Sequence, residues 1–425
     1  MGARRLHSLR KLGWETTMLP EQYTMSRVVL GLEKFLRDGL KVYSKAKIAV
    51  LTNASAIDSH GRKSIDLLIE SGFKIVKIFA PEHGLEGALA DGMPVPDHNY
   101  HGIPVYSLFG TRARPSSDLL TDIDILLYDI QDVGVRFYTY IYTLIYCMEE
   151  CANAKKKVII LDRPNPLSSR IEGPRVKKNF ESFVGGYGLP VRYGLTAGEL
   201  ARYVKEVFKV EVDLEIVPME RYNPKMYFDE TGLFWSTPSP NLPSLEHAIL
   251  YSGLCLLEGV NVSVGRGTVH PFKYIGAPWI NSDVLYAELK RLNHPGITFR
   301  KIAFIPWAFK FKNELCHGLE FFITNRNEFR PLELAIDLIA ILKRTNPEKF
   351  SWDKYYHAPQ DQPYFDFLIG DSSYRERIEK GATSKDFVEL WEKEAKEFSQ
   401  LVESFRLYPI KYRKVLWLRN EFTQR

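Results

Sequence analysis

The chain has 425 residues, and its 57 lysines and arginines against 52 aspartates and glutamates give a formal charge of +5. Hydrophobic residues make up 45% and charged residues 26%, a globular mixture that can offset chain entropy, so wholesale disorder is excluded. The charge is small for this length and both signs are interspersed, so we expect no nucleic-acid partner. The length favours two or three domains.

The cysteines and the hydropathy of the sequence indicate the cellular compartment of the protein. Cys147, Cys151, Cys255 and Cys316 form no CxxC pair, so they predict buried free thiols and neither a disulfide framework nor a zinc site. Residues 1–25 begin with basic residues but contain no continuous apolar run of the kind found in secretory signals. No stretch approaches ~18 apolar residues, so we expect no membrane insertion. Together these observations predict a cytoplasmic protein in which residues 1–25 are a flexible extension.

The order of the predicted elements indicates an α/β fold. After a helix expected over residues 26–40, four short runs are continuously apolar, which is typical of strands buried on both faces. These runs are 47–53, 74–82, 124–132 and 157–166. Helical patterns at 63–71 and 138–153 lie between them, and this alternation predicts a Rossmann-like parallel sheet.

The pattern changes after about residue 205. Residues 209–220 alternate like a strand, and short strands are then mixed with helices at 331–344 and 384–405. We therefore predict a Rossmann-like catalytic domain over 26–205 and an auxiliary α+β domain over 206–425. The groove between two such domains is the natural pocket.

Polar side chains stand at or just after the C-terminal ends of the four predicted strands. Ligands of open α/β sheets bind at this edge, because loops and helix N-termini converge there. We therefore expect a ligand cleft at this edge, although Asp and Asn at such turns can also act only as helix caps. The candidate residues are Asn53, Glu82, His83, Asp129, Gln131, Asp132, Asp162 and Arg163.

Several common motifs are missing from the sequence. No GxGxxG follows the first strand and no GxxxxGK[ST] occurs, which disfavours dinucleotide and P-loop nucleotide binding. The chain also lacks HExxH, GxSxG and a histidine cluster with metal-ligand spacing. We therefore expect no cofactor and no metal.

Eight motifs follow one another between about residues 45 and 415. They are FAPEHGLEG (79–87), GIPVYSLFGTR (102–112), YDIQDVGVRFYTY (128–140), LDRPNPL (161–167), IEGP (171–174), TPSPNLP (237–243), EGVNVSVGRGT (258–268) and PFKYIGAPWI (271–280). In this order and spacing they resemble the family of exo-acting β-N-acetylmuramidases, long described as a domain of unknown function. The resemblance implies a glycosidase that removes N-acetylmuramic acid from the non-reducing ends of peptidoglycan-derived fragments, with its cleft between a Rossmann-like and an auxiliary domain.

Glycosidic cleavage needs a proton donor for the leaving oxygen and a second group that acts as base, nucleophile or electrostatic stabiliser. We expect Glu82 to be the acid, because partial burial at a strand end would raise its pKa towards a useful value. His83 could orient this acid or bond a sugar hydroxyl. The resemblance makes Glu172 the second catalytic carboxylate, with Asp129 and Asp132 as rivals. The acetamido oxygen of the substrate could instead act as an internal nucleophile.

The lactyl carboxylate distinguishes N-acetylmuramic acid from N-acetylglucosamine, and a planar arginine side chain suits it. The candidate arginines are Arg136, Arg163, Arg192 and Arg266. Asn241 and Asn261 could bond sugar hydroxyls, or only close their own loops. Tyr138, Tyr140 and Trp279 could stack on sugar faces, but helical aromatic residues belong more often to the core.

Two other functions stay open at this point. A non-catalytic amino-sugar-binding protein could use the same cleft, and tight binding of muramic acid without turnover would favour it. A metal-dependent hydrolase could use Glu82, His83, Asp129 and Asp162 as ligands, and loss of activity on chelation would reveal it. The expected partner is a small substrate, either a muropeptide or a disaccharide that contains N-acetylmuramic acid.

Overall fold

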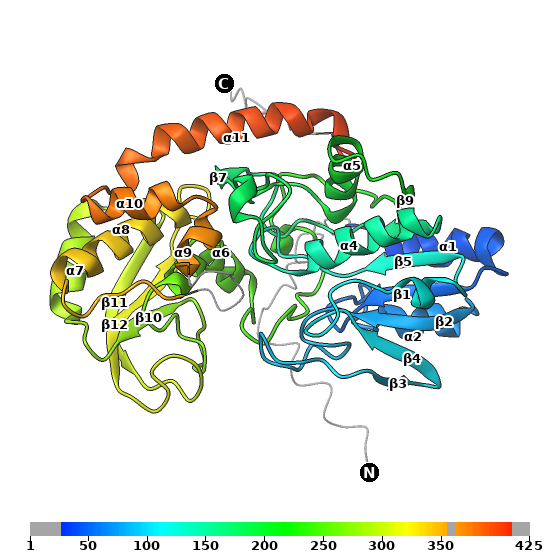
Figure 1. Cartoon of the computed structure of the whole chain (residues 1–425), viewed down its shortest axis with the longest axis horizontal. Coiled ribbons are helices and arrows are strands. Elements are labelled where there is room, and N and C mark those ends of the chain that lie inside the picture. Colours follow the sequence, from blue (N-terminus) through cyan, green and yellow to red (C-terminus); the bar gives the residue numbers. More distant parts are fainter. Residues whose placement is uncertain (1–26, 355–361, 410–425) are drawn as a thin grey trace, which may run out of the picture.

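The computed structural model describes residues 27–354 and 362–409, so the extension predicted at 1–25 lies outside the described residues. A seven-stranded sheet forms the first domain (Figure 1). Its strands are β1 (Ile48–Thr52), β2 (Ile75–Ala80), β3 (His98–Tyr100), β4 (Ile103–Ser107), β5 (Ile125–Asp129), β6 (Lys157–Leu161) and β9 (Asp213–Val217). They lie in the order β3-β4-β2-β1-β5-β6-β9, and all neighbours are parallel except β3 and β4. The predicted α/β fold with a Rossmann-like parallel sheet is confirmed.

Helices cover both faces of this sheet, which explains why its strands are continuously apolar. The helices of the first domain are α1 (Gly31–Tyr43), α2 (Ser64–Glu70), α3 (Ser117–Leu120), α4 (Tyr140–Asn153) and α5 (Ala197–Val207). In β1, Ile48 and Val50 belong to the core shared with α1 and α2, whereas Ala49 and Leu51 belong to the core shared with α4 and α5. A strand buried on both faces leaves no position for polar alternation.

The second domain is built on a three-stranded antiparallel sheet in the order β10-β12-β11. Its strands are β10 (Tyr274–Ala277), β11 (Ile297–Phe304) and β12 (Cys316–Ile323). Its helices are α6 (Leu245–Leu254), α7 (Ser282–Leu292), α8 (Pro331–Thr345), α9 (Tyr364–Ile369), α10 (Ser372–Glu379) and α11 (Val388–Val402). This mixture agrees with the predicted α+β character of the second domain.

A short pair of strands and one long helix connect the two domains. A short antiparallel pair, β7 (Glu172–Arg175) and β8 (Pro190–Arg192), belongs to the first part of the chain. Figure 1 shows α11 lying across the top of both domains, and it packs on β7. The main-chain nitrogen of Arg175 donates to the Glu394 carboxylate of α11 at 2.6 Å. The last long helix of the chain therefore holds the two domains together.

The first sheet extends beyond the boundary that we predicted at residues 205/206. Its edge strand β9 pairs in parallel with β6, so residues assigned by sequence to the second domain complete the sheet of the first. Helix α5 leads directly into this strand, as in any β–α–β crossover. The alternation of residues 209–220 reflects an edge strand that is buried less deeply than its neighbours.

Tyr408 ties the end of the described chain to the first sheet. Its buried hydroxyl donates to Asp162 at 2.6 Å, and Asp162 also accepts from the Thr196 hydroxyl at 2.7 Å and from the Gly198 main chain at 2.9 Å. Burial raises the pKa of Asp162 to about 6, although the three hydrogen bonds oppose this shift. Asp162, predicted to bind substrate, is therefore a structural junction in this fold.

We expect Tyr408→Phe to lower the free energy of unfolding by about 1–3 kcal/mol, because the buried Asp162 carboxyl group loses a donor. Urea denaturation would measure this loss. Tyr43→Phe is the matched control: the Tyr43 hydroxyl also donates to a carboxylate at 2.6 Å, that of Glu215, but at a partly exposed site. We expect it to lose less than about 1 kcal/mol. Equal losses in the two variants would contradict the burial argument.

Candidate functional site

A cavity of about 750 Å³ lies between the two domains. Its first-domain wall comes from the loops that follow β2 and β5, at the C-terminal edge of the parallel sheet, and includes Glu82 and Thr139. Its second-domain wall includes Tyr251 on α6, and Glu258 and Arg266 in the segment that follows this helix. This volume falls in the range typical of small-molecule sites.

Two hydrogen bonds hold the carboxyl group of Glu82 in this cavity. The main-chain nitrogen of Gly92 donates to Oε1 at 3.0 Å, and the Thr139 hydroxyl donates to Oε2 at 2.7 Å. Only 8% of Glu82 is exposed. The carboxyl group therefore has one fixed orientation at the cavity wall, as a positioned acid or base requires.

His83 is buried beside Glu82 and also lines the cavity. Its Nδ1 atom lies 2.7 Å from the Leu89 carbonyl oxygen, which can only accept, so Nδ1 carries the proton. In the neutral ring Nε2 is then an acceptor. The backbone of His83 has a φ of 71°, in a region that non-glycine residues rarely occupy and that is often retained at functional sites.

Arg266 connects the two walls of the cavity. It donates through Nη1 to Asp91 of the first domain at 2.7 Å and through Nε to Glu258 of the second. Burial disfavours the charge of Arg266, but the neighbouring Glu258 and Asp91 carboxylates outweigh burial and raise its pKa. Asn241 donates to the same Asp91 oxygen at 3.0 Å. Two predicted site residues thus converge on one carboxyl group that we did not predict.

Asp91 belongs to the cavity wall, in the loop that leads from β2 to β3. Burial raises its pKa, Arg266 opposes this shift, and the charges of Glu258 and Glu82 add to it. The sequence analysis missed Asp91 because Asp-Gly typically marks a turn. Its position nine residues after Glu82, in the same loop at the binding edge, is the signal that could have found it.

Tyr138 belongs to the lining of the cavity. Its ring packs edge-on against Tyr140 and Tyr251, with centroid distances of 4.6 and 6.4 Å. Burial raises its pKa well above the ordinary value, so the phenol stays protonated. Its hydroxyl is buried beside Tyr140 and Ser239, so Tyr138 helps to build the wall of the cavity.

Four of the predicted site residues therefore meet at the cavity: Glu82, His83, Asn241 and Arg266. The remaining predicted residues are not part of its lining and bond elsewhere in the fold. They are Asn53, Asp129, Gln131, Asp132, Arg136, Asp162, Arg163, Glu172 and Asn261. Arg192, the further arginine candidate, is also outside the lining.

Several strand-end residues bond to one another beneath the cavity. Asp129 and Arg163 form a buried two-bonded ion pair, and Arg163 also donates to a main-chain oxygen at 2.9 Å. The side chain of Gln131 donates to two main-chain oxygens at 2.8 Å. Asp132 accepts from the Tyr193 hydroxyl, and burial raises its pKa to about 6. These polar groups stabilise the sheet edge on which Glu82 stands.

The remaining candidates close loops or join segments. Asn53 accepts from the Ser55 main chain and hydroxyl, at 3.0 and 2.6 Å. Arg136 is fully buried and donates to three main-chain oxygens, including that of Leu368 in the second domain at 2.7 Å. Asn261 bonds to the segment 349–351 through both ends of its amide. None of these three side chains is presented to the cavity.

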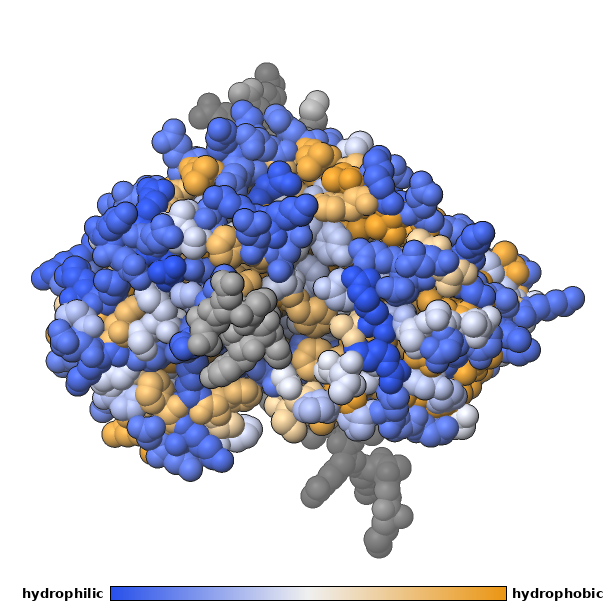
Figure 2. Space-filling view, viewed as in Figure 1, coloured by the Kyte–Doolittle hydropathy of each residue, from blue (hydrophilic) through white to orange (hydrophobic). Residues whose placement is uncertain are grey.

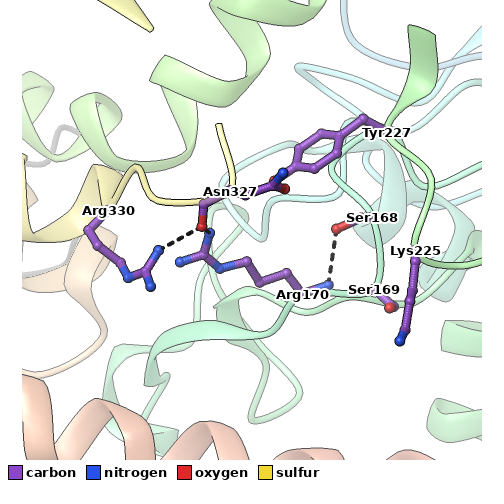
Figure 3. Close-up of a pocket in the computed structure, with 7 residues that line it drawn as sticks. All are labelled: Ser168, Ser169, Arg170, Lys225, Tyr227, Asn327 and Arg330. Carbon is purple, nitrogen blue, oxygen red and sulfur yellow. Dashed lines mark hydrogen bonds between the residues drawn. The ribbon is translucent and has the colours of Figure 1, made fainter. Parts of the chain in front are cut away.

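Glu172 belongs to a group of paired charged side chains, Arg170, Glu172 and Arg192, which we call the interdomain clamp. It forms ion pairs with Arg170 and with the buried Arg192. Figure 3 shows the open pocket beside this clamp, in which Arg170 and Arg330 approach each other. Both guanidinium groups donate to the main-chain oxygen of Asn327 in the second domain, at 3.2 and 3.1 Å. The structure thus places Glu172 outside the lining of the cavity that holds Glu82.

The following two findings concern metal binding and membrane spans, and they apply to the residues that the structure describes. Across 27–354 and 362–409, no group of three or more His, Cys, Asp or Glu side chains is arranged to hold a metal ion. Of the ligands considered for a metal-dependent hydrolase, Asp129 and Asp162 lie outside the cavity that holds Glu82 and His83. No helix within the same ranges is long and apolar enough to cross a membrane.

Two family models match the chain, and they describe the N-terminal and C-terminal parts of the exo-β-N-acetylmuramidase NamZ. The first covers residues 48–246 and the second residues 249–408. The chain belongs to this family. Its motifs therefore led to the correct family, and the two NamZ models meet between residues 246 and 249, within α6.

One curated relative and two solved structures each match nearly the whole chain. The peptidoglycan β-N-acetylmuramidase NamZ of Bacillus subtilis (strain 168) is 37% identical over 386 residues, which span 90% of this chain and 92% of that protein. The crystal structure of a DUF1343 family protein from Bacteroides fragilis NCTC 9343 superposes with a TM-score of 0.82 at 31% identity, covering 90% of this chain and 99% of that one. A second DUF1343 protein of that strain gives a TM-score of 0.70 at 29% identity, covering 91% and 100%.

We expect Glu172→Gln to act on stability and not on the chemical step, because Glu172 neutralises the buried Arg192. Loss of one partner of a buried ion pair should lower the free energy of unfolding by about 3 kcal/mol. Chemical denaturation would measure this loss, and turnover per folded molecule would be measured alongside. A loss of turnover as large as that of a cavity-acid variant, with stability unchanged, would restore Glu172 as a catalytic residue.

Proposed function

We propose that this protein hydrolyses the glycosidic bond of a non-reducing terminal N-acetylmuramic acid in peptidoglycan-derived fragments, with Glu82 as the general acid/base. Membership of the exo-β-N-acetylmuramidase NamZ family supports the reaction and the substrate. One observation carries the residue assignment: Glu82 stands in the interdomain cavity with both carboxyl oxygens fixed by neighbouring donors.

The surroundings of Glu82 suit proton transfer. As the glycosidic bond breaks, the leaving oxygen needs a proton, and a positioned carboxylic acid can give it. The Thr139 hydroxyl can donate to the carboxylate or accept from the carboxylic acid, so it orients Glu82 in both protonation states. His83 lines the same cavity, and its Nε2 atom can accept from a sugar hydroxyl.

We assign the role of second carboxylate to Asp91. It lines the same cavity, and the residue after it, Gly92, bonds to Glu82. The contacts from Arg266 and Asn241 both use Oδ1, which orients the carboxyl group and leaves Oδ2 outside these two hydrogen bonds. Asp91 could then either activate water as a base or, in a substrate-assisted route, orient the acetamido group of the sugar.

Recognition of the lactyl carboxylate falls to Arg266. Among the arginines that we predicted for this task, it is the one that lines the cavity. Its charge is shared with Asp91 and Glu258, so an anionic substrate would join a network in which the cation is already oriented.

We further propose that the protein acts in the cytoplasm on recycled cell-wall fragments, such as muropeptides or disaccharides that contain N-acetylmuramic acid. The cysteines support this location, because Cys147, Cys151, Cys255 and Cys316 are all buried as free thiols. Proteins of reducing compartments keep their cysteines in this form.

Glu82→Gln should lower the turnover of a disaccharide with a non-reducing terminal N-acetylmuramic acid by about 10²–10⁴-fold, because the leaving sugar oxygen loses its proton donor. Glu181→Gln is the matched control: Glu181 also lines the cavity, but its carboxylate accepts from the Tyr187 main chain at an exposed rim. Calorimetry with muramic acid should show that the Glu82 variant still binds. Wild-type protein that binds muramic acid without turnover would point to a non-catalytic sugar-binding protein.

The pH dependence of kcat/KM should report Asp91. As the pH falls through its pKa, the carboxylate takes up a proton and stops acting as base or acceptor, so activity falls. Because burial raises this pKa, the fall should begin at a higher pH than for an aspartate of the ordinary value, 3.8. Asp91→Asn mimics the protonated form and should remove this acidic limb while lowering activity at neutral pH. An identical acidic limb in both proteins would contradict the assignment.

A further inference from the structure

Two loops of the second domain meet beside the cavity. One contains Gly267 and follows Arg266, and the other, residues 305–315, connects β11 to β12. The main-chain nitrogen of Trp307 donates to the Gly267 oxygen at 2.8 Å. Gly267 has a φ of 71°, and a Cβ atom at this position would lie 2.5 Å from the Ala308 nitrogen, so only glycine permits this contact. The two loops therefore form one packed unit.

This unit exposes several large apolar side chains to solvent. Trp307 is 70% exposed and Val269 is 77% exposed, and the other members are more than two-fifths exposed. We call the set the apolar platform: Val269, Ile305, Trp307, Phe309 and Leu315. Figure 2 shows apolar surface on the lower part of the second domain, where Figure 1 places the loop between β11 and β12. Apolar side chains that gather on a surface in this way typically mark an interaction site.

The apolar platform is continuous with the cavity. The guanidinium group of Arg266, which lines the cavity, lies 5.6 Å from the centroid of the Phe309 ring. Lys310, the next residue, also lines the cavity, pairs with Asp353 and donates to the Glu258 main-chain oxygen at 2.8 Å. A ligand that extends out of the cavity over this wall would therefore pass onto the platform.

The backbone of the 305–315 loop has an unusual conformation. Phe309, Phe311 and Asn313 have φ values of 63°, 58° and 65°, in the left-handed region that aromatic residues rarely adopt. Such conformations persist where the surrounding contacts impose them, and they gather at ligand-binding sites. Here they bring Phe309 to Arg266 and leave Trp307 at the surface.

We propose that the apolar platform binds the leaving glycan, meaning the sugars that follow the terminal N-acetylmuramic acid towards the reducing end. This inference rests on the proposed function. If the cavity holds the non-reducing terminal sugar, the rest of the glycan chain must extend out of the cavity. The C–H face of a sugar ring packs on an indole ring, and the main-chain hydrogen bond of Trp307 fixes the backbone that carries this exposed ring. Lys312 is exposed in the same loop and suits the carboxylates of further muramic acid residues.

The test compares a disaccharide and a tetrasaccharide that both have N-acetylmuramic acid at the non-reducing end, so that the leaving group is a sugar hydroxyl in each. For the wild type, kcat/KM should be higher for the tetrasaccharide, because its leaving chain reaches the platform. Trp307→Ala should lower the kcat/KM of the tetrasaccharide, relative to that of the shorter substrate, by about fivefold, mostly through a higher KM for the tetrasaccharide. Trp307→Phe should restore most of this preference for the tetrasaccharide. Leu390→Ala, which removes an exposed apolar side chain on α11, should leave the ratio unchanged.

An unchanged ratio in Trp307→Ala would overturn the proposal, and so would an equal loss on both substrates, which would place the effect in the cavity. Weaker binding of Trp307→Ala to anionic phospholipid vesicles, with the ratio unchanged, would assign the platform to a lipid surface instead. If the wild type cleaves neither substrate, the proposed function fails separately. Calorimetry with the tetrasaccharide would then still decide whether Trp307 binds glycan.

Discussion

One ionic bridge organises the site: Arg266 lies between Asp91 of the first domain and Glu258 of the second. Without a shared cation, carboxyl groups brought together in a poorly solvated cavity would repel each other. The bridge also reaches Glu82, because Gly92, the residue after Asp91, donates one of the two hydrogen bonds that orient it. The closure of the cavity and the orientation of the acid therefore depend on the same guanidinium group.

The two domains contribute different chemistry around this bridge. The C-terminal edge of the parallel sheet supplies Glu82 and His83, so the groups that need exact placement directly follow the buried end of β2. The second domain supplies Arg266 and Lys310, together with the exposed aromatic loop beside them. The division suits an enzyme that performs one chemical step on a terminal sugar while accepting different chains attached to it.

Sequence patterns could predict the sheet and its binding edge, because strands buried on both faces leave a continuous apolar signal. They could not predict β4, in which Pro104 makes a strand improbable although the residue pairs with Asn99 of the edge strand β3. At the binding edge, residue type did not separate Glu82 from Asp129, since both are acidic strand ends. The two acids differ in their partners, because Arg163 neutralises Asp129. These two residues are 34 positions apart, so the sequence pattern around Asp129 does not reveal the contact.

The hydrogen bond between Tyr408 and Asp162 has a consequence for biosynthesis. Most of the first domain leaves the ribosome early, yet its buried Asp162 acquires this partner only after 246 further residues have been translated. Until then the nascent sheet carries a buried acidic group next to β6 that lacks one of its three donors. The first domain should therefore reach its final protease resistance only after residue 408 has left the ribosome.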